Sequence, residues 1–185
     1  AVIHPGLPLV KIQGMALLAG IAVARVLETR SEGVRLKWPN DVYADGKKLA
    51  GILLEVTGEY SSHCQVVIGV GLNLALSNSD AESIEQPWAE LRSFKPDLSR
   101  NEVAATILDE LLAVVDEFQR NGFAPYQQYW SERDIYHQQD VRIISAAHEK
   151  RGRVKGVNRK GELMLQTDNG IEVINAGELS VRPAD

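Results

Sequence analysis

Residues 34–57 read VRLKWPNDVYADGKKLAGILLEVT, and this stretch decides the fold of the N-terminal part of the chain. Residues 34–38 are typical of a short strand, which Pro39 ends because proline has no N–H for a neighbouring strand. A second short strand follows, and Asp45-Gly46 predicts a tight hairpin because both residues tolerate a positive φ. Residues 48–57 form the expected return strand. The stretch therefore predicts consecutive strands joined by tight turns.

One further strand and three helices are expected around this stretch. Residues 65–76 form an apolar strand with internal glycines, which suggest close approach by a ligand or another backbone. Residues 8–28 carry apolar side chains near helical spacing and predict a long, buried helix. Ser99 and Glu102 form a capping-box pattern before a second, amphipathic helix. Residues 125–132 suggest a short third helix.

The C-terminal part, from about Tyr136, alternates short apolar segments with turns. A run of about 50 residues of closely spaced strands indicates a small β-barrel. We place the boundary between the two parts within residues 131–138. The sequence therefore predicts two domains, residues 1–134 and residues 135–185.

The composition argues against several classes of protein. The chain has 185 residues and a net charge of −5, so its overall charge gives no reason to expect nucleic acid as the main partner. Cys64 is the single cysteine, which excludes an intramolecular disulfide and fits a reducing, cytoplasmic setting. The histidines show no ligand spacing, so we expect no zinc site. No apolar run reaches the length of a membrane span, so we expect no membrane partner.

Polar side chains that could bind a ligand or take part in catalysis are densest between the first strand and the return strand. Lys37 and the pair Lys47-Lys48 flank Asn40 and Asp41, which lie on a tight turn. Taken singly, each lysine is most simply a solvated charge, and Pro-Asn-Asp is most simply a turn. Taken together, the cations lie beside a glycine-containing strand and could hold an anionic ligand whose chain lies flat on the backbone. Glycines on neighbouring strands would leave an apolar slot for it.

Three motifs at this spacing resemble the pattern of bacterial biotin–protein ligases, which are related to the lipoate ligases. They are KWPND at 37–41, KLAGIL at 48–53 and GVGLN at 69–73. The resemblance continues through Trp88 and the capped helix to the C-terminal strands, so it covers nearly all of the chain. It implies an α+β fold, in which a mixed or antiparallel sheet with packed helices, part of a class II synthetase-like catalytic domain, precedes a small SH3-like β-barrel.

The resemblance also implies a reaction and its partners. In this family the carboxylate of biotin attacks the α-phosphate of ATP, with Mg²⁺, to form biotinyl-5′-AMP. A lysine of the biotin carboxyl carrier protein of acetyl-CoA carboxylase then takes biotin from the adenylate. The implied small molecules are therefore biotin, ATP and Mg²⁺, the carrier protein is the implied partner, and a homodimer is expected.

Residue roles follow from the resemblance, position by position. Lys48 matches the catalytic lysine that contacts both the biotin carboxylate and the α-phosphate. The biotin pocket matches Lys48 together with Gly51, Ile52, Leu53, Gly69 and Gly71. The ATP or adenylate side matches Lys37, Asn40, Asp41, Asn73, Trp88, Arg142 and Arg182. Within this set Asn73 would read the adenine, Trp88 would pack on it once the loop at 76–87 has ordered, and Asp41 is the expected Mg²⁺ ligand.

The sequence departs from the family pattern upstream of KWPND. The glycine- and arginine-rich biotin loop, the serine or threonine and glutamine positions that contact biotin, and the DNA-binding winged helix of some members do not occur in these 185 residues. We therefore expect the C-terminal portion of a ligase of the ligase/repressor type, which binds DNA only through an N-terminal domain absent here. Three alternatives stay open: a lipoate or octanoate ligase, a biotin-sensing transcription repressor, and an inactive fragment.

Overall fold

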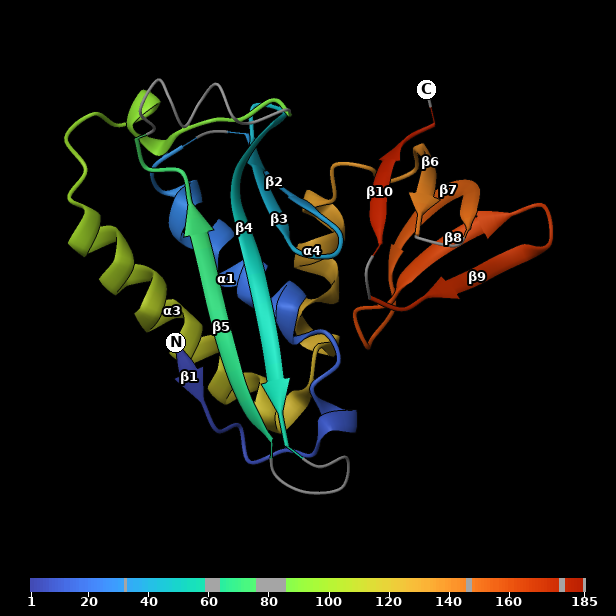
Figure 1. Cartoon of the computed structure of the whole chain (residues 1–185), viewed down its shortest axis with the longest axis horizontal. Helices are drawn as coiled ribbons and strands as arrows, with labels where there is room; N and C mark the ends of the chain where they lie inside the picture. The colour runs from blue at the N-terminus through green and yellow to red at the C-terminus, as the bar shows by residue number, and fades with distance from the viewer. Residues whose placement is uncertain (32, 59–63, 76–85, 146–147, 177–178, 185) are drawn as a thin grey trace.

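The computed structural model describes residues 1–31, 33–58, 64–75, 86–145, 148–176 and 179–184. In this part of the chain, two five-stranded antiparallel sheets lie side by side, and the α-helices gather around the first sheet (Figure 1). The predicted α+β fold is confirmed. None of the helices in the described ranges is long and apolar enough to cross a membrane.

The first sheet contains residues 34–57. Its strands are β1 (Val2–Ile3), β2 (Val34–Lys37), β3 (Asp41–Ala44), β4 (Lys47–Thr57) and β5 (Gln65–Leu72), in the order β1-β5-β4-β3-β2. All neighbours are antiparallel, which resolves the prediction of a mixed or antiparallel sheet. The predicted hairpin is confirmed, because Asp45 and Gly46 have φ values of 49° and 73°.

Three α-helices lie on one face of this sheet: α1 (Met15–Glu28), α3 (Arg100–Asn121) and α4 (Gln127–Arg133). Short 3₁₀ turns occupy Leu9–Lys11, Leu91–Ser93 and Ala124–Tyr126. The prediction that the first helix starts at residue 8 was wrong. Gly14 takes a left-handed conformation with a φ of 84° and so separates the first 3₁₀ turn from α1.

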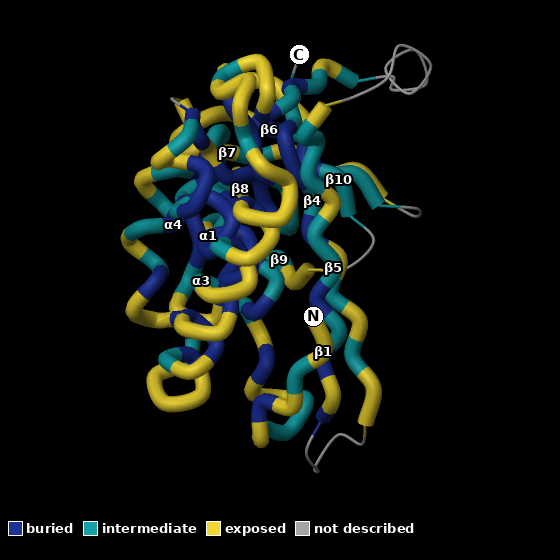
Figure 2. The backbone as a smooth tube through the Cα atoms, turned by 90° about the vertical axis from the view of Figure 1, so that its left-hand side faces the viewer, coloured by how far each residue is buried: buried dark blue, intermediate teal, exposed yellow. Residues whose placement is uncertain are grey.

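The core forms around α1, which packs between the sheet and the other two helices. Figure 2 shows this helix as a largely buried tube in the interior of the molecule. Its small residues Ala19, Ala22 and Ala24 are fully buried and let neighbouring elements approach closely. On α3, Ser99 Oγ accepts a hydrogen bond from the Glu102 N–H at 3.5 Å, so the predicted cap is confirmed.

The second sheet consists of β6 (Asp140–Ile144), β7 (Glu149–Val157), β8 (Leu163–Thr167), β9 (Gly170–Ile174) and β10 (Ser180–Pro183), in the order β10-β6-β7-β8-β9. The described residues include no pairing between β9 and β10, so we describe it as a five-stranded sheet rather than a closed barrel. The basic segment at residues 150–153 lies inside β7. Because successive side chains of a strand point to opposite faces, Lys150 and Arg151 lie on opposite faces of the second sheet.

Candidate functional site

A row of four residues crosses the first sheet. The strand register places Lys37 opposite Asp41, Asp41 opposite Gly51, and Gly51 opposite Gly71. Residues opposite one another in antiparallel strands project from the same face. This face is turned away from the helices, because the alternate residues Ala50 and Ile52 are buried beneath the sheet. The row therefore sets two charged groups beside two positions without side chains.

A β-bulge brings Lys48 onto the same face. Val42 pairs with Ala50 but Tyr43 pairs with Lys48, so β4 contains one extra residue at this point. In a regular strand Lys48, three positions before Gly51, would point to the opposite face and into the helices. With the bulge, its Nζ lies 2.6 Å from Asp41 Oδ1. Local backbone geometry thus creates the central ion pair of the site.

Asp41 is shared between two lysines. Its second oxygen, Oδ2, lies 3.9 Å from Lys37 Nζ, and Lys37 Nζ also donates a hydrogen bond to the Tyr43 hydroxyl at 3.4 Å. Burial lowers the pKa of Lys37, which is only 6% exposed; the Asp41 carboxylate opposes this shift, and the positive charges of Arg182 and Lys48 add to it. Two ammonium groups around one carboxylate leave a local positive charge, which suits an anionic ligand.

The glycines leave room directly beside the Lys48 ammonium. A Cβ added at Gly51 would lie 3.4 Å from Lys48 Cε and 3.5 Å from its Nζ. A Cβ at Gly71 would lie 3.8 Å from the Gly51 carbonyl oxygen, and Gly69 pairs with Leu53 two residues further along. Leu53 is 61% exposed on this face. The result is a flat backbone floor with an apolar side chain at one end and a cation at the other.

Asn40 and Ile52 are joined by a pair of hydrogen bonds. The Asn40 amide nitrogen donates to the Ile52 carbonyl and the Ile52 N–H donates to the Asn40 carbonyl, both at 2.8 Å. This pair of bonds fastens the KWPND turn to β4. Because the Ile52 side chain is buried against the helices and its N–H is occupied, we leave Ile52 out of the pocket.

Asn73 and the segment after residue 85 lie close to Lys48. The backbone of Lys48 accepts a hydrogen bond from Ala89 N–H at 2.9 Å and donates one to Pro87 at 3.0 Å, so Trp88 lies beside it. The Asn73 side-chain nitrogen donates to the carbonyls of Ala89 at 3.1 Å and Lys48 at 3.4 Å. A hollow of about 690 Å³ adjoins Trp88. The loop predicted at 76–87 lies mostly outside the described residues.

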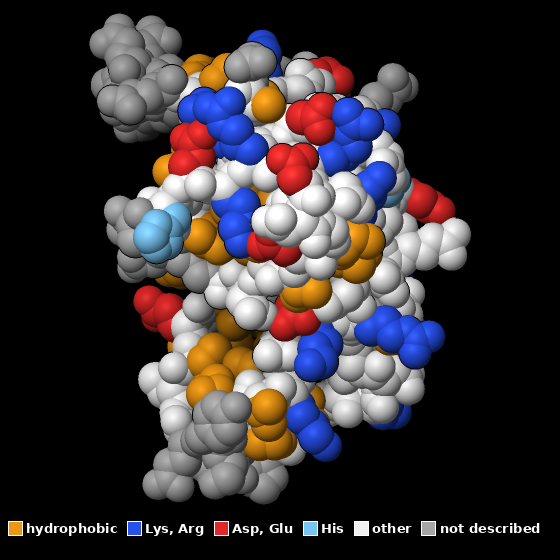
Figure 3. All heavy atoms as spheres, turned by 90° about the vertical axis from the view of Figure 1, so that its right-hand side faces the viewer, with side chains coloured by type: hydrophobic (Ala, Val, Ile, Leu, Met, Phe, Trp, Pro, Cys, Tyr) orange, Lys and Arg blue, Asp and Glu red, His pale blue; other side chains and the backbone are white. Residues whose placement is uncertain are grey.

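The two arginines of the second sheet differ in their surroundings. Arg142 and Arg182 pair across β6 and β10. Arg142 is engaged by its own sheet, with Nε donating to the Pro183 carbonyl at 3.3 Å and Nη1 at 3.6 Å from Glu149. Arg182 is exposed, and its positive charge acts to lower the pKa of Lys37. Figure 3 shows basic and acidic side chains interspersed over the face of the second sheet, with no large single-sign patch.

Asp41 is a poor candidate for a preformed metal site. The described residues contain no group of three or more His, Cys, Asp and Glu side chains that could hold a metal ion. Both oxygens of Asp41 already face ammonium groups. A cation would have to displace Lys48 from the carboxylate before it could bind there.

Tyr43 and Tyr136 are electrostatically coupled to the site, although the sequence did not predict this. Burial raises the pKa of Tyr43 to about 12, and burial also raises the pKa of Tyr136; the charges of Asp41 and Arg182 act on both phenols. Tyr43 follows Asp41 by two residues in a predicted strand, so the period of two could have placed it on the same face. Tyr136 lies 93 residues after Tyr43 along the chain, and no local pattern indicates its position.

Replacing Gly51 with valine is expected to weaken binding of the ligand that lies on this floor by about tenfold or more. The branched side chain would occupy the space beside Lys48 and disturb its contact with Asp41. Titration calorimetry with biotin on the full-length protein measures the effect. Thr57→Val is the matched control, because it changes the same face of β4 far from Lys48. Equal affinities for the two variants would contradict the proposed position of the slot.

Comparison with known proteins agrees with this geometry. Residues 3–73 match the Biotin/lipoate A/B protein ligase family, and residues 137–182 match the Biotin protein ligase C terminal domain. The chain is 37% identical over 173 residues to the Bifunctional ligase/repressor BirA of Escherichia coli, covering 93% of this chain and 54% of that protein. It is 31% identical over 170 residues to the Biotin--[acetyl-CoA-carboxylase] ligase of Mycobacterium tuberculosis, covering 89% and 61%.

Solved structures show the same arrangement. The apo biotin protein ligase of Aquifex aeolicus superposes with a TM-score of 0.81 and 26% identity, covering 95% of this chain and 77% of that chain. The same enzyme in complex with biotin and ATP gives a TM-score of 0.80 at 25% identity, covering 99% and 76%. The chain spans about half the length of these curated relatives. Because its two parts match these two family models and its sequence and fold match those of the ligases named above, the chain belongs to the biotin protein ligases.

Proposed function

We propose that this chain supplies the lysine pair and the adenylate side of an ATP-dependent biotin–protein ligase. The enzyme would form biotinyl-5′-AMP and transfer biotin to a lysine of the biotin carboxyl carrier protein of acetyl-CoA carboxylase. The observation that carries the proposal is Lys48 held over the Gly51–Gly71 floor by Asp41. A ligand with a flat apolar body and a terminal carboxylate fits a floor of this kind.

The first chemical step brings two anions together. A carboxylate oxygen of biotin attacks the α-phosphate of ATP, the bond to the leaving pyrophosphate breaks, and a mixed anhydride forms. Lys48 would lie between the two reacting groups and neutralise the charge that builds up on them. Because Asp41 fixes its ammonium, little reorganisation is needed when the substrates arrive. Lys48 therefore acts through its charge and position and forms no covalent bond.

In the second step the amine of the acceptor lysine attacks the carbonyl of the anhydride. The C–N bond forms, the bond to the phosphate oxygen breaks, and AMP leaves with the electron pair. Lys37 and Arg182 would hold the phosphate of the adenylate, and the effect of the Arg182 charge on the Lys37 pKa supports this pairing. In our proposal, retaining these contacts through both steps keeps the adenylate from leaving before transfer.

The adenine would lie between Asn73 and Trp88. Two backbone carbonyls hold the Asn73 amide nitrogen, which leaves its side-chain oxygen to accept from the adenine amino group. Trp88 is half-buried at the edge of the neighbouring hollow and offers an aromatic face. Arg142, paired with Glu149, stays a candidate for the acceptor side. Mg²⁺ would enter with the ATP phosphates, and we assign no step to a metal bound by Asp41.

The remaining predictions belong to the same proposal. We keep the boundary between domains at residues 134 and 135, a cytoplasmic setting, and a homodimer. Binding to DNA and a repressor function would require a DNA-binding domain elsewhere in the protein.

Incubation of the full-length protein with biotin, ATP and an acceptor domain tests the function. We expect release of pyrophosphate that depends on biotin, and a mass increase on one acceptor lysine. Lipoate and octanoate serve as competing substrates, and turnover of either one in preference to biotin would replace the proposal with a lipoate-type ligase. Titration of biotinyl-5′-AMP into this chain by itself then shows whether these residues bind the adenylate without the rest of the protein.

A further inference from the structure

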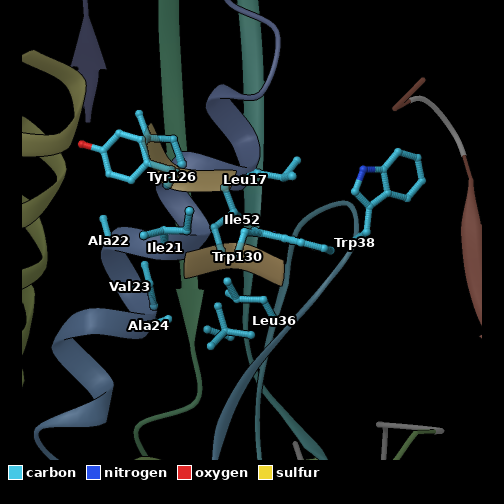
Figure 4. Close-up of a cluster of buried hydrophobic side chains, with 14 of the residues drawn as sticks. Leu17, Ile21, Ala22, Val23, Ala24, Leu36, Trp38, Ile52, Tyr126 and Trp130 are labelled. Carbon is cyan, nitrogen blue, oxygen red and sulfur yellow. The ribbon is translucent and has the colours of Figure 1, made fainter. Parts of the chain in front are cut away.

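Trp38, at the centre of the KWPND motif, binds the second sheet rather than the proposed ligand site. Its indole is only 2% exposed, and its Nε1–H donates to the Gly161 carbonyl at 3.2 Å. Gly161 lies 123 positions further along the chain, in the turn between β7 and β8. Figure 4 shows the Trp38 ring set apart from Tyr126 and Ile52, on the side of the core where the second sheet lies.

The turn that carries Gly161 has little freedom to move. A Cβ at Gly161 would lie 2.8 Å from the Gly14 Cα, so the turn packs directly on the start of α1. The Asn158 side-chain oxygen accepts from the backbone N–H of Lys160 at 2.9 Å and of Glu162 at 3.1 Å. The carbonyl that receives the indole hydrogen bond is therefore held from two sides.

A second contact fixes β2 at Leu36, two residues before Trp38. The Ile135 N–H donates to the Leu36 carbonyl at 2.9 Å, and Leu36 forms a β-bridge with Asp134. Leu36 and Trp38 flank Lys37, so both neighbours of this lysine are attached to the second sheet or to the segment that leads into it. The position of Lys37 thus depends on the placement of the second sheet, which also carries Arg182.

We propose that Trp38 is a positioning residue that holds the second sheet against the first, so that Arg182 and Lys37 face the same phosphate. The proposal rests on the ligase function argued above and deepens it. The hydrogen bond to Gly161 sets the approach of β10, and β10 carries the guanidinium. The proposed biotin floor lies on β4 and β5, and its glycines take no part in the hydrogen bond between Trp38 and Gly161. Nucleotide binding and biotin binding therefore depend differently on Trp38.

The test uses Trp38→Phe in the full-length protein, since phenylalanine keeps most of the ring but has no N–H. We expect the KM for ATP to rise about tenfold, as for a buried hydrogen bond whose acceptor is left unpaired. The KM for biotin should stay within about twofold of its original value. Arg182→Ala should raise the KM for ATP similarly, and adding Trp38→Phe to it should cause little further change.

Trp130→Phe is the matched control, because Trp130 is equally buried but lies on α4. It should lower the melting temperature and leave both KM values unchanged. Asn158→Ala, which loosens the turn but keeps Trp38, should raise the KM for ATP in the same direction if Trp38→Phe fails to fold. Equal KM changes in the Trp38 and Trp130 variants, or additive effects of Trp38→Phe and Arg182→Ala, would overturn the proposal. Absence of biotin transfer in the unmodified protein would instead refute the ligase function.

Discussion

Replacing Lys48 with alanine is expected to lower the rate of biotinyl-adenylate formation by about two to three orders of magnitude, which corresponds to the loss of one preorganised charge at a developing anion. The substitution also leaves Asp41 without the ammonium that lies 2.6 Å from its Oδ1. The Asp41 carboxylate, now compensated only by the more distant Lys37, would then face the carboxylate of biotin and the phosphates of ATP. The two effects act in the same direction.

Single-turnover measurement of pyrophosphate release, with biotin and ATP in excess over the full-length enzyme, isolates this step. Lys47→Ala is the matched control: it removes an adjacent, exposed lysine of the same strand. Its charge pairs with no residue of the row formed by Lys37, Asp41, Gly51 and Gly71. The rate of adenylate formation should therefore change by less than about twofold. If Lys48→Ala retained the original rate, the charge of Lys48 would not stabilise the transition state, and the proposed role would have to move to Lys37.

The sequence predicted those elements that depend on local chemistry. Asp45-Gly46 defines the hairpin because a two-residue turn needs positive φ values, and Ser99 with Glu102 defines the start of α3 because a helix leaves its first N–H groups unpaired. The start of the first helix was wrong for a related reason. The apolar pattern continues through residues 8–14, but Gly14 takes a left-handed conformation that no periodicity reveals.

The geometry of the site could not be predicted from local chemistry alone. Strict alternation counted back from Gly51 places Lys48 on the helix face, and only the bulge reverses this. The motif resemblance pointed to Lys48 as a candidate but did not explain how its side chain reaches the face that carries Gly51. It also placed Ile52 in the pocket, although the alternation that exposes Gly51 and Leu53 buries the residue between them.

Contacts between distant parts of the chain could not be predicted from the sequence. The Trp38 indole donates to a carbonyl 123 residues away. The charge of Arg182 affects the pKa of Lys37 only because the two sheets pack together. Neither contact leaves a periodic or compositional trace. KWPND is therefore informative as a motif for two separate reasons: Asp41 organises the ligand side, and Trp38 organises the contact between the sheets.

A second large effect is expected at Asp134, in the segment that joins the two sheets. The residue is 8% exposed; its Oδ1 accepts from the Tyr136 N–H at 3.0 Å, and its Oδ2 has no hydrogen-bond partner among the described residues. Burial raises the pKa of the Asp134 carboxyl from 3.8 to about 7, and the Tyr136 hydrogen bond opposes the shift. The folded protein therefore binds this proton more tightly than the unfolded chain.

The sign of the effect on stability follows from the two pKa values. Below pH 3.8 the group is protonated in both states and contributes no pH dependence. From there to about pH 7 the unfolded chain is ionised while the folded protein stays protonated, so the free energy of unfolding falls by about 1.4 kcal/mol per pH unit. Above this range both states are ionised, and a cost of up to about 4 kcal/mol persists.

Asp134→Asn removes this titration but keeps an oxygen that accepts from Tyr136. The added amide N–H₂ is a buried donor and should cost about 1–3 kcal/mol at every pH. We therefore expect the variant to be less stable than the original near pH 4.5 and as stable or more stable near pH 8. Urea unfolding at several pH values between these limits measures the crossing, and Asp116→Asn, an exposed carboxylate on α3, is the control. Parallel stability curves for Asp134→Asn and the original protein would show that Asp134 is ionised in the folded state throughout, and that its buried oxygen has a donor in solution.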